Sequence, residues 1–397
     1  MTRNEKLMIT VTTLFAFANQ MSQMFMNVYL YNYTGSLVVM SIYALIRVGL
    51  FPPLEWIAGK ISVKKSYAFT LTLGMILMMG RLSFVLLYNE AFAIHGWLVY
   101  FVAALDGISG GMYFLSSNTL NQVVTDTETR VRYMSVQGIF NNLSNVLSPL
   151  LSAFIIDMSI DDNTGYLNIF KCVLVIFAIM VILAFRMKID RSEDFTMKKK
   201  MWDKDDRKWN FCQMLTFIFG FRDSMMLTLT GIMVYNATGG SGSLYGKLLA
   251  FFALTTIIVF RMVSKKMNSG NLLKYYRSGS LLITTSTIIL VLVPNIYGAI
   301  YYGLANAIGT PMFNTCYSII TMNIVQDYTK QENIVGRMIA KESALSLSRC
   351  LGMAMIVVFY LVLPENLYLQ VSVILLSLTA FGSYVYANHY YKGQSIQ

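Results

Sequence analysis

The chain has 397 residues, of which 56% are hydrophobic, 14% aromatic and only 13% charged, whereas about 25% of the residues of an average soluble domain are charged. This composition excludes a soluble enzyme and a disordered chain, and the mean hydropathy of +0.55 is typical of a polytopic membrane protein. The net charge of +11 does not indicate nucleic-acid binding, because the basic residues are spread between apolar segments rather than gathered on one face.

Two long tracts without charge predict membrane spans. Residues 7–46 and 278–326 contain no Asp, Glu, Lys or Arg, and each is at least twice as long as the ~20 residues that cross a bilayer core. Each tract is therefore expected to hold two spans and a turn. Boundaries placed at charges, prolines and glycines predict twelve helices, at residues 7–31, 36–58, 67–88, 94–119, 133–157, 166–186, 209–235, 242–263, 277–294, 297–323, 336–363 and 366–388.

The distribution of Lys and Arg predicts the orientation of these spans. Segments on one side hold 25 of the 31 basic residues, and the turns on the other side hold none. Because basic loops stay in the cytoplasm, we expect both termini to be cytoplasmic. Arg3 and Lys6 precede the first span without a cleavage site of small residues, so this span is expected to be retained in a multi-pass plasma membrane protein.

An internal repeat predicts two similar halves. A hydrophilic basic linker, 187–208, separates an N-terminal bundle, 1–186, from a C-terminal bundle, 209–397. The first span ends in YNYTGS, from Tyr31, and the seventh in YNATGG, from Tyr235, an offset of 204. Two six-helix bundles related by a parallel repeat are therefore expected. The other matches are Phe15-x-Phe17 with Phe217-x-Phe219, and, at an offset of 200, Asp106 with Asn306 and Tyr113 with Phe313.

Twelve helices arranged as six plus six, with a basic central loop, resemble the major facilitator superfamily over nearly the whole chain. After the second helix, Gly59-Lys60-Ile61-Ser62-Val63-Lys64-Lys65 keeps the Gly and one base of the motif G-x-x-x-D-R-x-G-R, with Val63 at the acidic position. In the fifth helix, Ser148-Pro149-Leu150-Leu151-Ser152-Ala153 resembles the G-P-x-x-G-G of drug/proton antiporters, with small residues in place of glycine. The resemblance implies a transporter rather than an enzyme, with helices one, four, seven and ten around a central cavity.

Charged residues near the middle of the predicted spans are candidate functional groups. Left in lipid, five such charges would cost on the order of 12–17 kcal/mol, so they are expected to face a wet cavity or one another. Asp106 and Asp223 are predicted to carry a coupling proton, and Arg222 to bind an anionic or hydrogen-bond-accepting part of the substrate. The other predicted substrate-binding residues are Asn19, Gln20, Asn306 and Asn314, and the predicted interface or gating residues are Arg47, Arg349, Gly59, Pro149 and Ser152.

The alternative for these charges is an interhelical ion pair that fixes packing. Arg81, in the outer half of the third helix, is expected to extend its charge toward the membrane surface as a structural residue. The four cysteines lie in apolar segments without C-x-x-C spacing, so they are expected to be small buried hydrophobic residues, and no metal site or cofactor is predicted.

These features predict a secondary active transporter that works by alternating access, exports amphipathic or lipid-like molecules and is coupled to protons. Its expected partners are the small-molecule or lipid-like substrate, protons and membrane lipids, and it is expected to be a monomer. A proton-coupled uptake symporter for a small polar or anionic metabolite is the first alternative. A membrane sensor that uses a transporter scaffold without transport is the second.

Overall fold

A computed structural model describes the chain in eight segments, and these segments are helical apart from turns. The all-α fold with twelve spans is confirmed, as expected where the backbone must satisfy its hydrogen bonds away from water. The described residues are 2–125, 130–187, 202–203, 205–226, 229–267, 270–326, 334–364 and 367–394.

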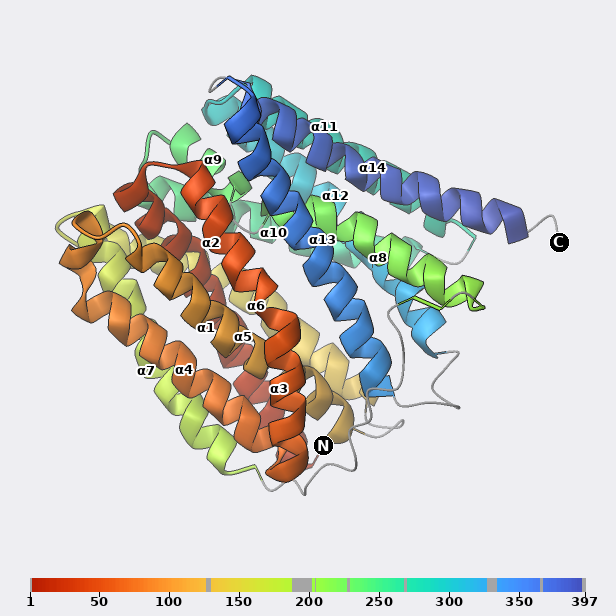
Figure 1. Ribbon diagram of the computed structural model, residues 1–397, viewed down its shortest axis with the longest axis horizontal. Helices are drawn as coiled ribbons and strands as arrows, with labels where there is room; N and C mark the ends of the chain where they lie inside the picture. Colours follow the sequence, from red (N-terminus) through yellow and green to blue (C-terminus); the bar gives the residue numbers. More distant parts are fainter. Residues whose placement is uncertain are drawn as a thin grey trace. The chain divides into compact units, whose positions relative to one another are not determined.

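The chain forms two compact units, and the first comprises Met1–Val39, Ile46–Thr196 and Gly242–Ala250. Its helices (Figure 1) are α1 (Arg3–Thr34), α2 (Leu37–Gly49), α3 (Phe51–Lys64), α4 (Tyr67–Leu87), η1 (Asn89–Ala93), α5 (Leu98–Val123), α6 (Arg130–Asp157) and α7 (Asp162–Phe185).

The second unit comprises Met40–Leu45, Met197–Ser241 and Phe251–Gln397. Its helices are α8 (Arg207–Met226), α9 (Leu229–Ala237), α10 (Gly242–Lys266), α11 (Leu272–Leu292), α12 (Ile296–Gln326), α13 (Ile334–Val362) and α14 (Tyr368–Gln394).

The units differ from the contiguous halves expected from the sequence, because the first residues of α10 belong to the first unit. The backbone N–H of Gly242 donates to Asp162 Oδ2 at 2.7 Å, and Lys247 Nζ lies 2.9 Å from Asp157 Oδ2. A short segment of α2, Met40–Leu45, is grouped with the second unit. Most of the predicted linker, 187–208, lies outside the described residues.

One span predicted as a single helix is built from two. The span 36–58 is divided at Leu50, where Pro52 and Pro53 open α3, since proline lacks the N–H that a continuous helix requires. In the span predicted at 209–235, the described residues are helical on both sides of 227–228, as α8 and α9. The helix predicted from residue 166 begins at Asp162, because the Asp161 side chain accepts from the Thr164 N–H and caps it.

Among the described residues, nine helical spans are long and apolar enough to cross a membrane by length and composition. The others are α1, α11 and α12, which have 32, 21 and 31 residues and so also reach the ~20 residues needed. They carry more polar side chains: α1 contains Asn19, Gln20 and Gln23, and α12 contains Asn306 and Asn314.

The internal repeat is visible in how the helices of each unit pack. In the first unit α1 contacts α6 and α7, and α4 contacts α5 and α7. In the second unit α8 contacts α13 and α14, and α11 contacts α12 and α14. Each helix of the first set corresponds to one of the second at the same place in its half, so the two units repeat one packing scheme.

Aromatic and glycine contacts fix the register of this repeat. Phe15 stacks on Tyr113 with ring centroids 3.7 Å apart, and Phe219 stacks on Phe313 with centroids 5.6 Å apart. The equivalent residues are therefore Phe15 and Phe219, at the offset of 204, so the match of Phe15-x-Phe17 with Phe217-x-Phe219 is wrong by two residues.

Two glycines give the register of the third and ninth spans. A Cβ on Gly74 would lie 2.9 Å from the Tyr113 backbone nitrogen, and one on Gly279 would lie 2.8 Å from that of Phe313. Gly74 and Gly279 are thus equivalent, at an offset of 205, and this offset aligns Arg81 with Ser286.

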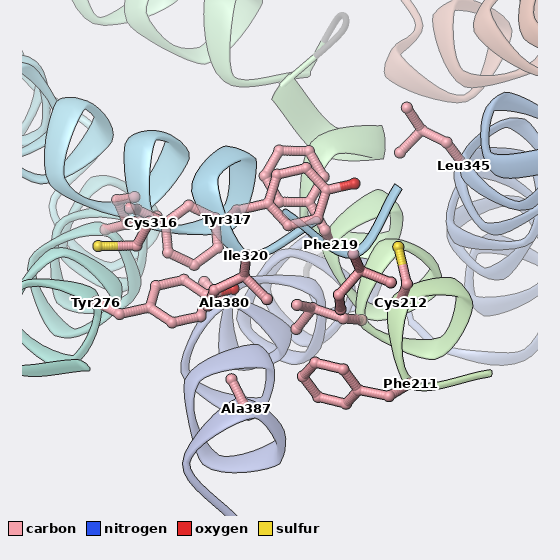
Figure 2. Packing of buried hydrophobic residues seen from close by; sticks show 14 residues of the cluster. Phe211, Cys212, Phe219, Tyr276, Cys316, Tyr317, Ile320, Leu345, Ala380 and Ala387 are labelled. Carbon is pink, nitrogen blue, oxygen red and sulfur yellow. The ribbon is translucent and has the colours of Figure 1, made fainter. Parts of the chain in front are cut away.

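The core of the second unit is a cluster of aromatic, aliphatic and cysteine side chains from α8, α11, α12, α13 and α14 (Figure 2). Cys212 and Cys316 are buried in it, as predicted. Cys172 on α7 is exposed and Cys350 on α13 is half-buried, so burial of all four cysteines was wrong, since apolar helices in lipid place apolar side chains on their outer faces as well.

Three glycines of α5, Gly107, Gly110 and Gly111, lie at close contacts with neighbouring helices. A Cβ on Gly107 would lie 2.7 Å from the Arg47 carbonyl oxygen, and one on Gly111 would lie 2.8 Å from Leu54 Cβ. These glycines let α5 approach the backbone of α2 and α3, as small residues do between membrane helices. This close approach places Arg47 beside α5.

We expect Gly107→Ala to destabilise the protein by about 1–3 kcal/mol, because the added methyl group meets a backbone oxygen that cannot rotate away. Thermal unfolding in detergent measures the effect. Gly80→Ala is the matched control, since a Cβ there has no neighbour within 4 Å. Equal unfolding temperatures for the two variants would contradict the packing argument.

Candidate functional site

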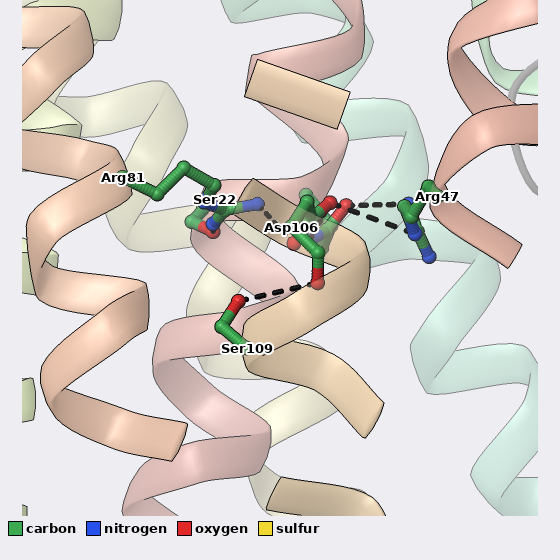
Figure 3. Close-up of polar contacts among 6 residues, drawn as sticks. Ser22, Arg47, Arg81, Asp106 and Ser109 are labelled. Atoms are coloured by element: carbon green, nitrogen blue, oxygen red, sulfur yellow. Dashed lines mark hydrogen bonds and ion pairs between the residues drawn. The ribbon is translucent and has the colours of Figure 1, made fainter. Parts of the chain in front are cut away.

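Asp106, on α5, is the centre of a buried polar cluster in the first unit (Figure 3). Its Oδ1 forms an ion pair with Arg81 Nη1 from α4. Its Oδ2 lies 3.5 Å from Arg47 Nε on α2, and the Asp106 and Arg81 side chains are only 5% and 2% exposed. The expectation that Arg81 extends toward the membrane surface is wrong, because the Asp106 carboxylate holds its guanidinium inside the unit.

Gln23, on α1, links Asp106 to Arg47. Its Nε2 donates to both oxygens of Asp106 at 3.2 Å, and its Oε1 accepts from Arg47 Nη1 at 2.8 Å. Arg81 Nη2 also donates to Ser22 Oγ on α1, at 3.3 Å. The cluster therefore joins α1, α2, α4 and α5 through one carboxylate.

The second unit holds a separate ion pair on α8 and α13. Arg349 donates from Nε and Nη2 to Asp223 Oδ2, at 2.8 Å and 2.6 Å. Both side chains are 19% exposed, so this pair is more accessible than the Asp106–Arg81 pair. Arg222 does not share this pair, since adjacent residues on a helix diverge by ~100°.

Arg222 is buried beside this pair without an ion-pair partner among the described residues. It is 2% exposed, and its Nε and Nη2 have no hydrogen-bond partner. Its guanidinium carbon lies 5.6 Å from the centre of the Phe313 ring. A buried guanidinium in this state is costly unless an acceptor reaches it.

Asn306, on α12, occupies the position equivalent to Asp106. Its Nδ2 donates to Ser286 Oγ at 2.8 Å and to the Tyr302 carbonyl oxygen at 3.0 Å. Since Ser286 is equivalent to Arg81, a neutral Ser286–Asn306 pair in the second unit replaces the charged Arg81–Asp106 pair of the first. The repeat thus keeps the contact and changes its charge.

The other predicted substrate-binding residues lie on the expected helices. Asn19 and Gln20 are half-buried on α1. On α12, Asn314 is half-buried, and its Oδ1 is buried without a hydrogen-bond partner in the described part of the chain. No contact among the described residues joins Asn19 or Gln20 to the Asp106 cluster, and their role stays a prediction.

The predicted gating segment of α6 packs closely on two helices. A Cβ on Gly246 of α10 would lie 3.0 Å from both the Pro149 carbonyl oxygen and the Ala153 Cβ. Ser148 Oγ donates to the Phe17 carbonyl oxygen of α1 at 3.0 Å, and Ser152, one turn later, is fully buried. The residues against α10 are thus Pro149 and Ala153, and the gating roles of Pro149, Ser152 and the buried Gly59 stay predictions.

Sequence reasoning missed Gln23 and Ser286 as members of these clusters. A signal for Gln23 was its position one helical turn after Asn19, which places both on one face of α1. For Ser286 the signal was the match of Gly74 with Gly279, which aligns Ser286 with Arg81. Neither signal states the partner, because that depends on how the helices are rotated against each other.

The fold and the charged groups held inside its membrane spans define a multi-pass membrane transporter. The chain belongs to the Major Facilitator Superfamily, whose sequence profile matches residues 7–341. It is therefore a secondary transporter of a small-molecule substrate and not an enzyme.

Two bacterial relatives are themselves uncharacterized. The chain is 25% identical over 325 residues to the uncharacterized protein YqgE of Bacillus subtilis (strain 168), an alignment that covers 80% of this chain and 73% of that protein. It is 26% identical over 171 residues to an uncharacterized protein in the sodM 3′ region of Geobacillus stearothermophilus, covering 43% of this chain and 78% of that protein.

Solved structures share the fold at low sequence identity. A bacterial homologue of the iron transporter ferroportin, in an inward-facing state, matches with a TM-score of 0.66 and 15% identity over 97% of both chains. A bacterial metal transporter matches with a TM-score of 0.62 and 14% identity, over 97% of this chain and 98% of that one. The human organic anion transporter MFSD10 matches with a TM-score of 0.59 and 12% identity, over 97% of this chain and 100% of that one. At these identities the likeness shows the fold alone.

Proposed function

We propose that this protein is a proton-coupled exporter of amphipathic or lipid-like molecules in the plasma membrane, acting as a monomer with both termini in the cytoplasm. The observation that carries the proposal is the accessible Asp223–Arg349 pair next to the buried, unpartnered Arg222. A transporter needs charged groups inside the membrane that can exchange one partner for another. Such groups cost free energy of insertion, so they usually mark a functional site.

Asp223 has better support than Asp106 as the proton carrier. A carboxylate can take a proton only if water reaches it, and Asp223 is 19% exposed whereas Asp106 is 5% exposed. Asp106 also has two arginines and Gln23 as partners, which tie α5 to α1, α2 and α4. We therefore assign proton coupling first to Asp223. The first role of Asp106 is to hold the first unit together, and coupling is its second role.

Export is supported by the α6 segment from Ser148 to Ala153 and by the close contact of Pro149 and Ala153 with α10. Small residues at a helix contact allow sliding with little change in volume. Uptake of a small anionic metabolite is the second candidate, and the observation that favours it is the excess of arginine over aspartate in the middle of the spans.

One structural neighbour is a metal transporter and another is a homologue of an iron transporter, but the residues here do not favour a metal ion as cargo. Transition metals bind groups of His, Cys, Asp and Glu, and the described residues contain no group of three such side chains that could hold a metal. The central charged residues, four arginines and two aspartates, would also repel a cation.

Vesicles of both orientations, made from cells that overproduce the protein, test transport and its direction. The probes are 2-naphthoate, 2-naphthamide and 2-naphthylmethylammonium, which share one apolar body and differ in charge. With an imposed pH gradient, we expect inside-out vesicles to accumulate at least one probe and right-side-out vesicles to accumulate none. Accumulation only in right-side-out vesicles would establish uptake instead.

Ala153→Leu should abolish this accumulation while the protein still inserts and folds, because the larger side chain blocks movement of α6 against Gly246. Ser152→Leu tests the fully buried position one turn after Ser148 in the same way. Leu151→Phe is the control, since Leu151 is 40% exposed and can enlarge outward. Full transport by Ala153→Leu would remove the gating role from this contact.

A further inference from the structure

The middle of the spans in each unit contains two arginines and one aspartate. In the first unit these are Arg47, Arg81 and Asp106, and in the second Arg222, Arg349 and Asp223. Arg81 and Arg349 each form the close ion pair with the aspartate of their own unit. One arginine per unit therefore has no carboxylate of its own.

The next acidic residue of the second unit, Glu342, acts electrostatically on Arg349, which already has Asp223, and not on Arg222. Glu55 follows Arg47 by eight residues, ~12 Å along a helix. In the second unit, Glu342 directly follows Lys341, which matches its charge, and lies seven residues from Arg349. Each unit thus keeps an excess of positive charge in the middle of its spans. This excess matters more at Arg222 than at Arg47, because Arg222 is the more buried of the two.

The free edge of Arg222 has the geometry of an anion site. Its unpartnered nitrogens are Nε and Nη2, which lie on the same edge of the planar guanidinium. Two parallel N–H groups on one edge match the two oxygens of a carboxylate, phosphate or sulfonate. Asp223 does not fill this edge in the structure, where its Oδ2 accepts both bonds from Arg349.

Apolar and aromatic side chains lie near Arg222. The Phe313 ring lies 5.6 Å from the guanidinium carbon. Met226 follows Arg222 by one helical turn and so shares its face of α8, and Tyr302 donates from its hydroxyl to Met226 Sδ at 3.3 Å. These side chains suit the apolar body of an organic molecule better than a bare inorganic ion.

The internal repeat shows that this site occurs once. At the offset of 204, the residue equivalent to Arg222 is Ala18 on α1, which has no polar side chain. The first unit therefore lacks a guanidinium at this place, and a single anion per chain is expected.

We propose that the cargo is an organic anion, whose acidic group binds the Nε–Nη2 edge of Arg222 and whose apolar body packs against Phe313, Tyr302 and Met226. This inference rests on the proposed transport function and names the chemical class of its substrate. The excess of arginine over aspartate disfavours cations, and a neutral molecule leaves the buried charge of Arg222 uncompensated.

Binding to the full-length protein in lipid nanodiscs tests the inference without any gradient. The probes are 2-naphthoate, decanoate and decyl phosphate, with 2-naphthamide and 2-naphthylmethylammonium as neutral and cationic counterparts, and empty nanodiscs correct for partition into lipid. We expect at least one anion to bind with a stoichiometry of one, and its neutral and cationic counterparts to bind at least tenfold more weakly.

The variants locate the site. Arg222→Gln should weaken anion binding at least tenfold, and Arg222→Lys should weaken it severalfold, since a lysine keeps the charge and loses the two-pronged edge. Lys247→Gln removes the same charge from an exposed position and should change the affinity less than twofold. Unchanged binding by Arg222→Gln, or equal binding of 2-naphthamide and 2-naphthoate, would overturn the inference.

A second measurement does not depend on the choice of probe. If Arg222 is kept for an anion, Arg222→Met should leave the unfolding temperature of the ligand-free protein equal or raise it, because a buried unpaired charge is removed. Arg349→Met should lower it, since Asp223 then loses its partner. A decrease in Arg222→Met as large as in Arg349→Met, or no binding by any of the three anions, would overturn the inference.

The two proposals fail in different ways. Binding of an anion through Arg222 without accumulation in either vesicle would remove the transport proposal and keep the anion site. Accumulation of the neutral or cationic probe, unchanged in Arg222→Gln, would keep transport and remove the anion.

Discussion

Asp106→Asn alone should destabilise the protein by about 3–5 kcal/mol, the usual cost of removing one partner from a buried ion pair. Arg81, with a side chain only 2% exposed, would then be buried without its carboxylate. The double variant Arg81→Ser with Asp106→Asn should cost much less, because it recreates in the first unit the Ser286–Asn306 contact that the second unit already uses.

A double-mutant cycle on the unfolding free energy measures this effect. Arg81→Ser and Asp106→Asn are compared singly and together, and we expect strong coupling of the two substitutions. Arg47 tolerates the double change, since it is 14% exposed and keeps its 2.8 Å bond to Gln23 Oε1. Additive effects would show that the Arg81–Asp106 contact does not hold the first unit together.

The stability of Asp106→Asn determines which variant can test proton coupling by Asp106. If Asp106→Asn reduces the folded fraction, a loss of transport in that variant says nothing about protons. The informative comparison is transport by the Arg81→Ser, Asp106→Asn double variant, in which the buried charges are removed together. Accumulation driven by a pH gradient in that background would assign Asp106 to structure.

Much of the fold was predictable because it follows from composition and order along the chain. Charge-free tracts gave the spans, and the YNYTGS and YNATGG turns gave the repeat. Helix ends were less predictable, since the structure extends α12 from Ile296 to Gln326 beyond the predicted 297–323. A helix does not stop where the bilayer ends, so its first polar residue is a poor marker of its end.

Partners inside the bundle were not predictable for a different reason. Helices that are apolar on most faces give no hydrophobic stripe from which to read their rotation. The depth of Arg81 and Asp106 could be estimated from sequence, but their contact depends on how α4 and α5 face each other. The same holds for Gln23, which reaches Asp106 across 83 residues of sequence.

Asp223→Asn should abolish accumulation driven by a pH gradient and preserve exchange of labelled for unlabelled substrate across the membrane. Exchange without net proton movement needs the binding site and the conformational change, but not a titrating carboxylate. Neutral Asn at 223 resembles the protonated acid: it can accept a hydrogen bond from Arg349 but no longer forms an ion pair. The variant is thus fixed in one of the two states between which coupling must alternate.

Asp223→Glu and Asp157→Asn are the controls for this prediction. Glu keeps a carboxylate at the site, so we expect partial retention of gradient-driven accumulation. Asp157 is an acid at the end of α6 that pairs with Lys247 and is 46% exposed, so its replacement should leave coupling intact. If Asp223→Asn accumulates 2-naphthoate as the parent protein does, the coupling proton is carried elsewhere. If it loses exchange as well, the Asp223–Arg349 pair is needed for the conformational change itself, whatever ion drives it.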